Sequence, residues 1–400
     1  MEIKLKDKLS SFEAQKIIDA LRAGTVPMQY LDLLTAGREF WLDSIKEDLA
    51  FITQGASKVR FIAAYYGGGK THFLNLVKRE ALLRNFAVAY VELNSRESPM
   101  DKFEIIFPKI MRGVVISNSE NGLEAIFDHW ISNFKIYSRR EIETKLREIA
   151  PSMDFRAALR AYLEFAGLDS PEAKDYLSTI LGWLCGNKLT PSFVIKTGIR
   201  NSISVANVSE ILGSFLRFVR NCGFSGLLLL LDEAEAVTSL AQSKRRNEAN
   251  QNIKKLLDNA DNHMGFFILF ATTPKFLDDP EVGAKSYPAL WDRIKDVLDI
   301  SMRYPNKRGL IIPLQPLKKN DLLRLGNIIV PIHELAYGWN GKNRLRTNAI
   351  NQYADQFQKK SKERLVRTYI RGLVSLLDLV EQNEDFNVEK EIENIQFPET

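Results

Sequence analysis

The chain has 400 residues, 45% of them hydrophobic, and carries 55 Lys and Arg against 50 Asp and Glu, a formal net charge of +5. No apolar run approaches the roughly 18 residues that a membrane-spanning helix needs, and the first residues lack the apolar core of a secretion signal, so we expect a cytoplasmic protein. The two cysteines, Cys185 and Cys222, and the four histidines show no metal-ligand spacing, which argues against a structural zinc site.

Two helices are expected before the first strand. Residues 11–23 repeat apolar side chains with helical spacing, and Gly24 ends the pattern. A second helix is expected to follow the segment 37–39 and to reach about Phe51.

A phosphate-binding loop, the Walker A motif, is the most informative stretch of the chain. The apolar run 61–64 ends in glycines that are followed by Lys70, Thr71 and a helical pattern. Glycines let backbone N–H groups surround phosphate oxygens, and the helix start adds positive potential. Lys70 would reach the β- and γ-phosphates, and Thr71 would place its hydroxyl on Mg²⁺. Ala64 replaces the usual first glycine, and the alternative is a glycine-rich turn with a chance Lys-Thr pair. The expected nucleotide-binding residues are Tyr66, Gly67, Gly68, Gly69, Lys70, Thr71 and His72.

A second strand is expected at 86–93, and helices are expected after it. Residues 101–205 hold several amphipathic patterns, one of which starts with Ser170 as N-cap and Pro171 at the first helical position. The aromatic residues that recur there fit a hydrophobic core better than a binding surface. We therefore expect a helical insertion at 101–205.

An acidic pair follows the third expected strand. Five leucines at 227–231 indicate a central strand covered on both faces, and Asp232 and Glu233 end it as a Walker B motif. Asp232 would hold Mg²⁺ and Glu233 would polarise the attacking water; the alternative is a buried strand that ends in a solvated acidic turn. A fourth strand is expected at 265–271. The hydroxyl of Thr272 would then orient the water or, alternatively, only cap the strand.

The C-terminal part is expected to contain a short fifth strand at 309–314 and then helices. Residues 301–380 hold fifteen Lys and Arg against five Asp and Glu, whereas 381–400 hold one Lys and seven acids. A basic region of this kind favours a polyanion partner such as DNA, and a solvated helical surface is the alternative.

Five pieces of the chain together resemble the ATP-binding proteins of BREX phage-defence systems, which are similar to the initiator clade of AAA+ ATPases. These pieces are residues 21–24, 37–39, 66–74, 231–235 and 290–293. The resemblance implies an α/β P-loop NTPase of the AAA+/ASCE type. This fold is a three-layer sandwich with a parallel five-stranded sheet of order 5-1-4-3-2, a helical insertion and a C-terminal helical lid.

The resemblance also implies two arginine roles. Arg293 matches the position of an arginine finger that reaches the nucleotide of a neighbouring subunit. A lid arginine would sense the γ-phosphate; Arg367 is our first choice and Arg364 the second, and either could instead be a surface charge.

The expected function is ATP binding and hydrolysis with Mg²⁺ by a homo-oligomer that acts on DNA with partner defence proteins. The alternative is an ATP-dependent assembly switch or scaffold with little turnover. The expected domains are the N-terminal helices and first part of the core at 1–100, the insertion at 101–205, the second part of the core at 206–316, and the helical lid with an acidic tail at 317–400.

Overall fold

The computed structural model describes residues 9–134, 138–260, 262–295, 305–345 and 348–397. Within these ranges, no helix combines the length and the apolar character needed to cross a membrane.

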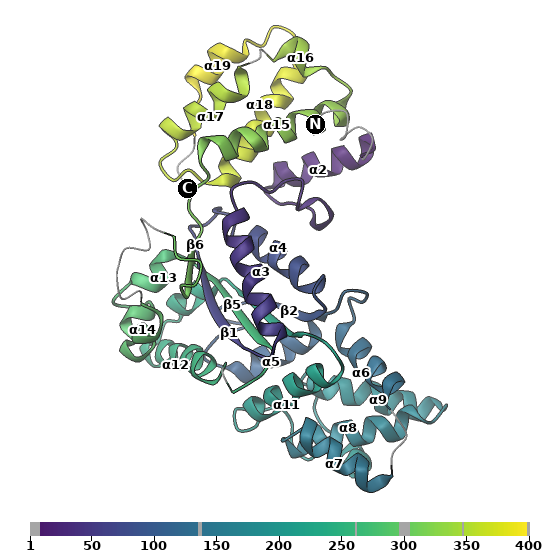
Figure 1. The fold of residues 1–400 in the computed structure, drawn as a ribbon. Coiled ribbons are helices and arrows are strands. Elements are labelled where there is room, and N and C mark those ends of the chain that lie inside the picture. The colour runs from purple at the N-terminus through teal and green to yellow at the C-terminus, as the bar shows by residue number, and fades with distance from the viewer. Residues whose placement is uncertain (1–8, 135–137, 261, 296–304, 346–347, 398–400) are drawn as a thin grey trace. The chain divides into compact units, whose positions relative to one another are not determined.

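The chain forms two compact units, each built from separated segments (Figure 1). The first comprises Met1–Asp43, Ala64–Leu76 and Pro313–Thr400, and the second comprises Ser44–Ala63 and Val77–Ile312. The glycine-rich loop therefore belongs to the first unit, whereas almost all of the sheet belongs to the second.

The sheet has six strands in the order β3-β2-β4-β5-β1-β6. Neighbouring strands among β2, β4, β5 and β1 are parallel. Without β3, the order is the predicted 5-1-4-3-2. The strands are β1 (Lys58–Ala63), β2 (Phe86–Glu92), β3 (Val114–Val115), β4 (Gly226–Asp232), β5 (Phe266–Thr272) and β6 (Ile311–Pro313).

The prediction of a parallel sheet with five strands is wrong at one edge. β3 pairs antiparallel with β2, placing Val115 opposite Val88 and Val114 opposite Ala89. A strand of two residues is too short to leave a periodic pattern in the sequence. It also lies within 101–205, where we expected only helices. The sheet is therefore mixed and has six strands.

The centre of the sheet is fully enclosed. Every residue of β4 and β5 is buried, so both faces of these strands are covered, as the run of leucines predicted. Helix α11 (Val208–Asn221) packs on β4, and α12 (Ser243–Ala260) packs on β1. After the acidic pair, the chain forms the 3-10 helix η2 (Ala234–Ser239). Beyond β5 it forms α13 (Pro274–Asp278) and α14 (Pro288–Ile294).

The region between β2 and α11 is mainly helical. Its helices are α5 (Phe103–Arg112), α6 (Gly122–Asn133), α7 (Arg139–Ile149), α8 (Met153–Ala166), α9 (Pro171–Leu184) and α10 (Pro191–Thr197). The side chain of Ser170 caps α9 as predicted. Aromatic rings of this region are core residues: the Phe127 ring is buried 4.8 Å from that of Phe218 in α11 and 4.7 Å from that of Tyr162.

The first unit contains a group of helices in which α2 lies beside α15 (Figure 1). Helix α2 begins with a capping box of Ser10 and Glu13, ends at the left-handed Gly24 and packs on α15 and α18. A short helix, α19, lies in the acidic tail, and residues 398–400 of that tail lie outside the described residues. The helices are α2 (Ser11–Ala23), α15 (Lys319–Tyr337), α16 (Gly341–Arg344), α17 (Ala349–Lys360), α18 (Val366–Gln382) and α19 (Val388–Asn394). Two helices, α3 (Glu39–Thr53) and α4 (Lys70–Leu82), run from one unit into the other.

Candidate functional site

Parallel strands of the second unit end together at one edge of the sheet. The register pairs Ala63 at the end of β1 with Thr272 at the end of β5, and Glu92 of β2 with Asp232 of β4. Asp232 and Thr272 are both buried. Since β4, β5 and β1 are successive strands, the sheet brings the predicted residues Asp232, Glu233 and Thr272 to one carboxyl edge.

Both carboxylate oxygens of Asp232 accept hydrogen bonds. Oδ1 accepts the backbone N–H of Glu233 at 2.9 Å, and Oδ2 accepts the hydroxyl of Tyr90 at 2.7 Å. Burial, and then the bond to Asp232, raise the pKa of Tyr90 well above its usual value. Each carboxylate oxygen has two lone pairs, so Asp232 can still accept a metal ion or its water, and hard oxygen ligands suit Mg²⁺.

Two further features mark this edge as unusual. Glu233 has φ 56° and ψ 40°, a left-handed conformation that costs a non-glycine residue about 1–3 kcal/mol. The Oγ1 atom of Thr272 is buried and has no hydrogen-bond partner among the described residues. A buried hydroxyl in this state is normally satisfied by water or by a ligand.

The glycine-rich loop of the first unit follows β1 directly in the chain. Gly67 and Gly69 have φ of 72° and 94°, where side chains are strained. A Cβ on Gly68 would lie 2.9 Å from the carbonyl oxygen of Tyr65, too close for any other residue. The conformation of this loop therefore requires glycine at these positions, as in a phosphate-binding nest of backbone N–H groups.

The two residues that follow the loop begin α4. Lys70 is 5% exposed, with its Nζ 3.4 Å from the carbonyl oxygen of Ala64 and 4.6 Å from the ring centroid of Tyr66. Thr71 is exposed. The Lys70 ammonium therefore lies close to backbone and side-chain groups of the loop, as expected for a cation that binds phosphate there.

The predicted nucleotide-binding residue His72 faces the N-terminal segment. Its Nε2 lies 2.9 Å from Oγ1 of Thr35, which itself donates to the carbonyl oxygen of Leu31 at 2.6 Å. The Thr35 hydroxyl therefore accepts from Nε2–H of His72. Burial, and then the charge of Arg38, lower the pKa of His72 to about 4, so the ring is neutral at neutral pH.

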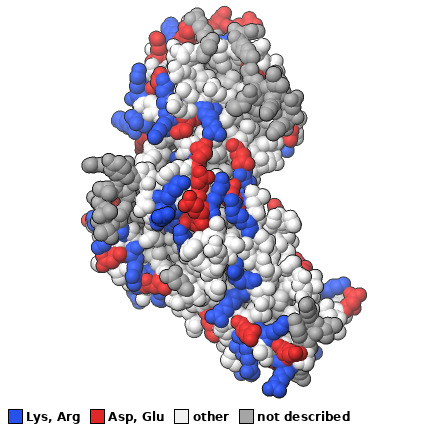
Figure 2. Space-filling view, viewed as in Figure 1, with Lys and Arg blue, Asp and Glu red and all other residues white. Residues whose placement is uncertain are grey.

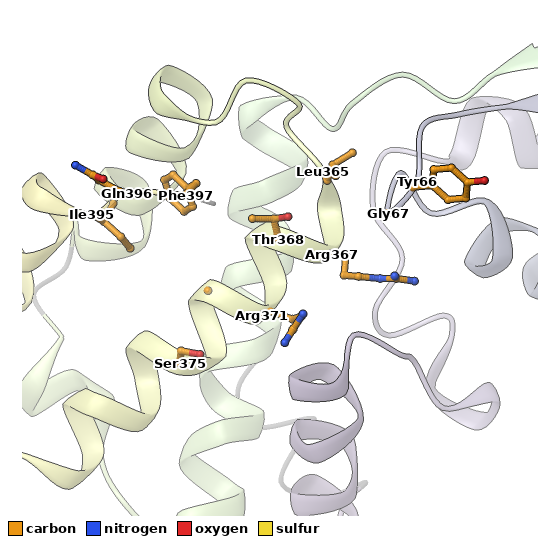
Figure 3. A pocket seen from close by; sticks show the side chains of 11 residues that line it. Tyr66, Gly67, Leu365, Arg367, Thr368, Arg371, Ser375, Ile395, Gln396 and Phe397 are labelled. Atoms are coloured by element: carbon orange, nitrogen blue, oxygen red, sulfur yellow. The ribbon is translucent and has the colours of Figure 1, made fainter. Parts of the chain in front are cut away.

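A cavity of about 360 Å³ lies beside the loop within the first unit (Figure 3). The backbone N–H of Arg367 donates to the carbonyl oxygen of Gly67 at 3.4 Å, and the Arg367 side chain extends from α18 toward the loop. Arg364 does not line this cavity. The lining residues are Tyr66, Gly67, Leu365, Arg367, Thr368, Arg371, Gly372, Ser375, Ile395, Gln396 and Phe397.

Arg293 lies away from the carboxyl edge. In α14, its Nε is 3.0 Å from Oδ1 of Asp258, and it lines a cavity of about 680 Å³ with Lys58 and Val59 at the start of β1. β1 has six residues, so at ~3.3 Å per residue its two ends are about 17 Å apart. The structure therefore does not bring Arg293 together with Asp232 and Thr272.

Sequence reasoning missed two residues that contact the predicted ones. Tyr90 is the one hydroxyl-bearing side chain in the otherwise apolar run before Glu92. This exception in the sequence pattern could have indicated a functional side chain. Arg38 lies in the segment 37–39, which contributes to the family resemblance, but no sequence pattern predicts its contact with the loop carbonyl of Gly68.

A mostly parallel sheet with a glycine-rich Lys-Thr loop after β1 and an Asp-Glu pair ending β4 is the arrangement of a P-loop nucleotide-binding protein. The family model for the BREX system ATP-binding protein BrxC/D matches residues 9–396. The chain belongs to this family, which confirms the resemblance seen in the sequence. No curated protein matches the chain.

Proposed function

We propose that this protein binds and hydrolyses ATP with Mg²⁺ as a homo-oligomer, and that it acts on DNA with partner proteins in phage defence. The observation that carries hydrolysis is the carboxyl edge of the sheet. There, Asp232, Glu233 and the buried hydroxyl of Thr272 end neighbouring strands. The family description, which names ATP binding and the BREX system, supports the ligand and the setting.

The loop residues bind the phosphates in this proposal. Gly67, Gly68 and Gly69 present backbone N–H groups without steric interference, and Lys70 places its ammonium on the β- and γ-phosphate oxygens. Thr71 and Asp232 would hold Mg²⁺ through hydroxyl and carboxylate oxygen. Bound Mg²⁺ supplies charge neutralisation on the phosphate oxygens.

The acidic edge acts on the water. Glu233 accepts a hydrogen bond from the attacking water and takes its proton, and the unpartnered hydroxyl of Thr272 orients that water. Arg367, which lines a cavity with loop residues, interacts with the γ-phosphate, and its place in that cavity favours it over Arg364. Arg293 acts as the arginine finger of a neighbouring subunit, a role supported by its distance from the carboxyl edge of its own sheet.

Two variants test the proposal. Lys70→Ala should lose ATP affinity because the loop loses its charge on the phosphates. Glu233→Gln should keep ATP affinity and lose turnover by roughly 10²-fold or more, because an amide cannot take a proton. Unchanged turnover in Glu233→Gln would refute the assigned role of Glu233. Little turnover in the wild type, while ATP still drives assembly, would mean that the protein is a switch or scaffold instead.

The proposed DNA contact needs exposed cations. Besides the basic region 301–380, the residues Lys244, Arg245 and Arg246 of α12 are candidates for this contact. Arg245 pairs with Asp101 at 2.7 Å and Arg246 donates to backbone carbonyls, so both also stabilise the fold. Lys359 and Arg364 are exposed. On the face seen in Figure 2, basic and acidic side chains are interspersed. Arg303 and Arg346 of the basic region lie outside the described residues.

A further inference from the structure

Arg38 bridges two segments that are far apart in the sequence but belong to the same unit. Its Nη2 donates to the carbonyl oxygen of Gly68 at 3.0 Å, 30 residues away. Its Nη1 donates to the carbonyl oxygen of Gln315 at 2.9 Å, 277 residues away. The side chain is buried, with the residue 6% exposed. One guanidinium thus joins the glycine-rich loop to the segment that leads into α15.

The bond to Gly68 determines the direction of a loop N–H group. The Gly68 carbonyl and the Gly69 N–H share a planar trans peptide, so they point in opposite directions. Holding the carbonyl on Arg38 therefore directs the Gly69 N–H to the side away from Arg38. Glycine on both sides of this peptide would otherwise let it flip at little steric cost.

The neighbours of Arg38 contact the start of α15. Gly37 has φ 68°, a conformation in which a side chain is strained, and a Cβ there would lie 2.7 Å from Oδ2 of Asp321. The Glu39 carboxylate pairs with Arg324 at 2.5 Å. The segment 37–39 therefore lies against the first two turns of α15 while Arg38 reaches the loop.

Burying a charged guanidinium costs free energy, so the hydrogen bonds that Arg38 makes must compensate for this cost. Burial lowers the pKa of Arg38 to about 10, opposed by the charges of Asp321 and Glu39, so the group remains protonated at neutral pH. Its two hydrogen-bond acceptors are backbone carbonyls, and bonds from a charged donor are stronger than neutral ones. A displacement of either carbonyl would leave a buried charge poorly satisfied.

We propose that Arg38 is a positioning residue that orients the loop for phosphate and couples occupancy of the loop to the segment before α15. This inference rests on the proposed binding of ATP at the loop. Arg38 needs no contact with the nucleotide, because it acts through the Gly68 and Gln315 carbonyls.

The first test uses amide hydrogen exchange of the full chain without nucleotide. Arg38→Gln should speed exchange in residues 65–71 and 313–320, because both carbonyls lose their charged donor. Arg324→Gln is the matched control, since it removes the partner of Glu39 and leaves the contact with Gly68 intact. Equal loop exchange in wild type and Arg38→Gln, or equal acceleration by Arg324→Gln, would overturn the proposal.

The second test measures ATP binding with the same variants. Arg38→Gln should weaken the binding of ATP by roughly 10- to 100-fold, the scale for loss of hydrogen bonds to a charged group. The ATP affinity of Arg38→Lys should lie between those of the wild type and Arg38→Gln, because an ammonium keeps the positive charge but not the planar pair of N–H donors of a guanidinium. ATP should protect 313–320 in wild type and Arg324→Gln but not in Arg38→Gln.

Two outcomes separate the possible failures. If Arg38→Gln does not fold, the Arg38→Lys variant is measured in its place. The proposal is overturned if that variant shows the amide exchange rates of the wild-type loop and the wild-type affinity for ATP. If the wild type binds no ATP, the proposed function is contradicted instead, and exchange without nucleotide still decides whether Arg38 holds the loop.

Discussion

The hydroxyl of Tyr90 donates to Oδ2 of Asp232 at 2.7 Å, from the strand next to the one that Asp232 ends. With the N–H of Glu233 on Oδ1, a donor holds each oxygen of the carboxylate. The side chain therefore has a defined orientation before any metal ion binds. Groups that orient a metal ligand in this way commonly tune its affinity.

Replacing Tyr90 by Phe should raise the Mg²⁺ concentration needed for half-maximal ATP turnover. The ring stays and only the hydroxyl is lost, so Asp232 gains freedom to rotate. We expect a shift of roughly 10-fold or more, the lower end of the effect of removing such a partner. A magnesium titration of steady-state ATPase activity checks this.

The matched control is Tyr162→Phe, since Tyr162 donates from α8 to Oδ1 of Asp128 at 3.2 Å, far along the chain from the acidic pair. It should leave the Mg²⁺ dependence unchanged. The same shift in both variants would mean that the Tyr90 hydroxyl serves general stability.

His72 should make the protein less stable in weak acid. Its folded pKa is lowered to about 4, whereas an unfolded histidine titrates near ~6.5. Between these values the unfolded chain binds a proton that the folded chain does not, so this contribution is complete above pH ~6.5 and is lost as the pH falls. His72→Gln keeps an N–H donor for Thr35 without titrating, and its melting temperature should fall less between pH 7 and 4.5. Parallel pH profiles of the two proteins would refute this.

Arg293→Ala should spare ATP binding and reduce hydrolysis by ~10³-fold, the scale of a trans arginine finger. Mixing it with Glu233→Gln should restore some activity, because mixed interfaces pair an intact Glu233 with an intact Arg293. Lys254→Ala is the control, because Lys254 also pairs with Asp258, and it should stay active. Full activity of Arg293→Ala, or no recovery in mixtures proven to co-assemble, would argue against the trans role.

DNA binding, if phosphate contacts drive it, should weaken steeply with salt and show little sequence preference. Lys359→Ala and Arg364→Ala should each reduce the slope of log affinity against log salt by about one. Lys319→Ala should change it less, because Lys319 already pairs with Asp355 at 2.7 Å. No binding at low salt with ATP present would leave a solvated basic surface as the explanation.

Features that reside in contiguous residues were predictable. The glycine loop with Lys70, the buried leucine strand before Asp232 and the end of α2 at Gly24 each depend on neighbours in the chain, whose steric and hydrogen-bonding preferences are local. The order of five strands was implied by the resemblance to AAA+ ATPases, and it is compatible with right-handed crossovers between parallel strands. Local chemistry therefore accounts for the type of fold and for the candidate nucleotide loop.

Contacts between distant segments depended on packing and register. β3 has two residues and exists only because β2 offers an edge, so its own sequence carries no pattern. Tyr90 meets Asp232 across 142 residues because parallel strands align, and Arg38 reaches the carbonyl oxygen of Gln315 across 277 residues because both segments belong to one unit. Such pairings are decided by the tertiary structure, since a buried polar group takes whichever partner the fold brings within hydrogen-bonding distance.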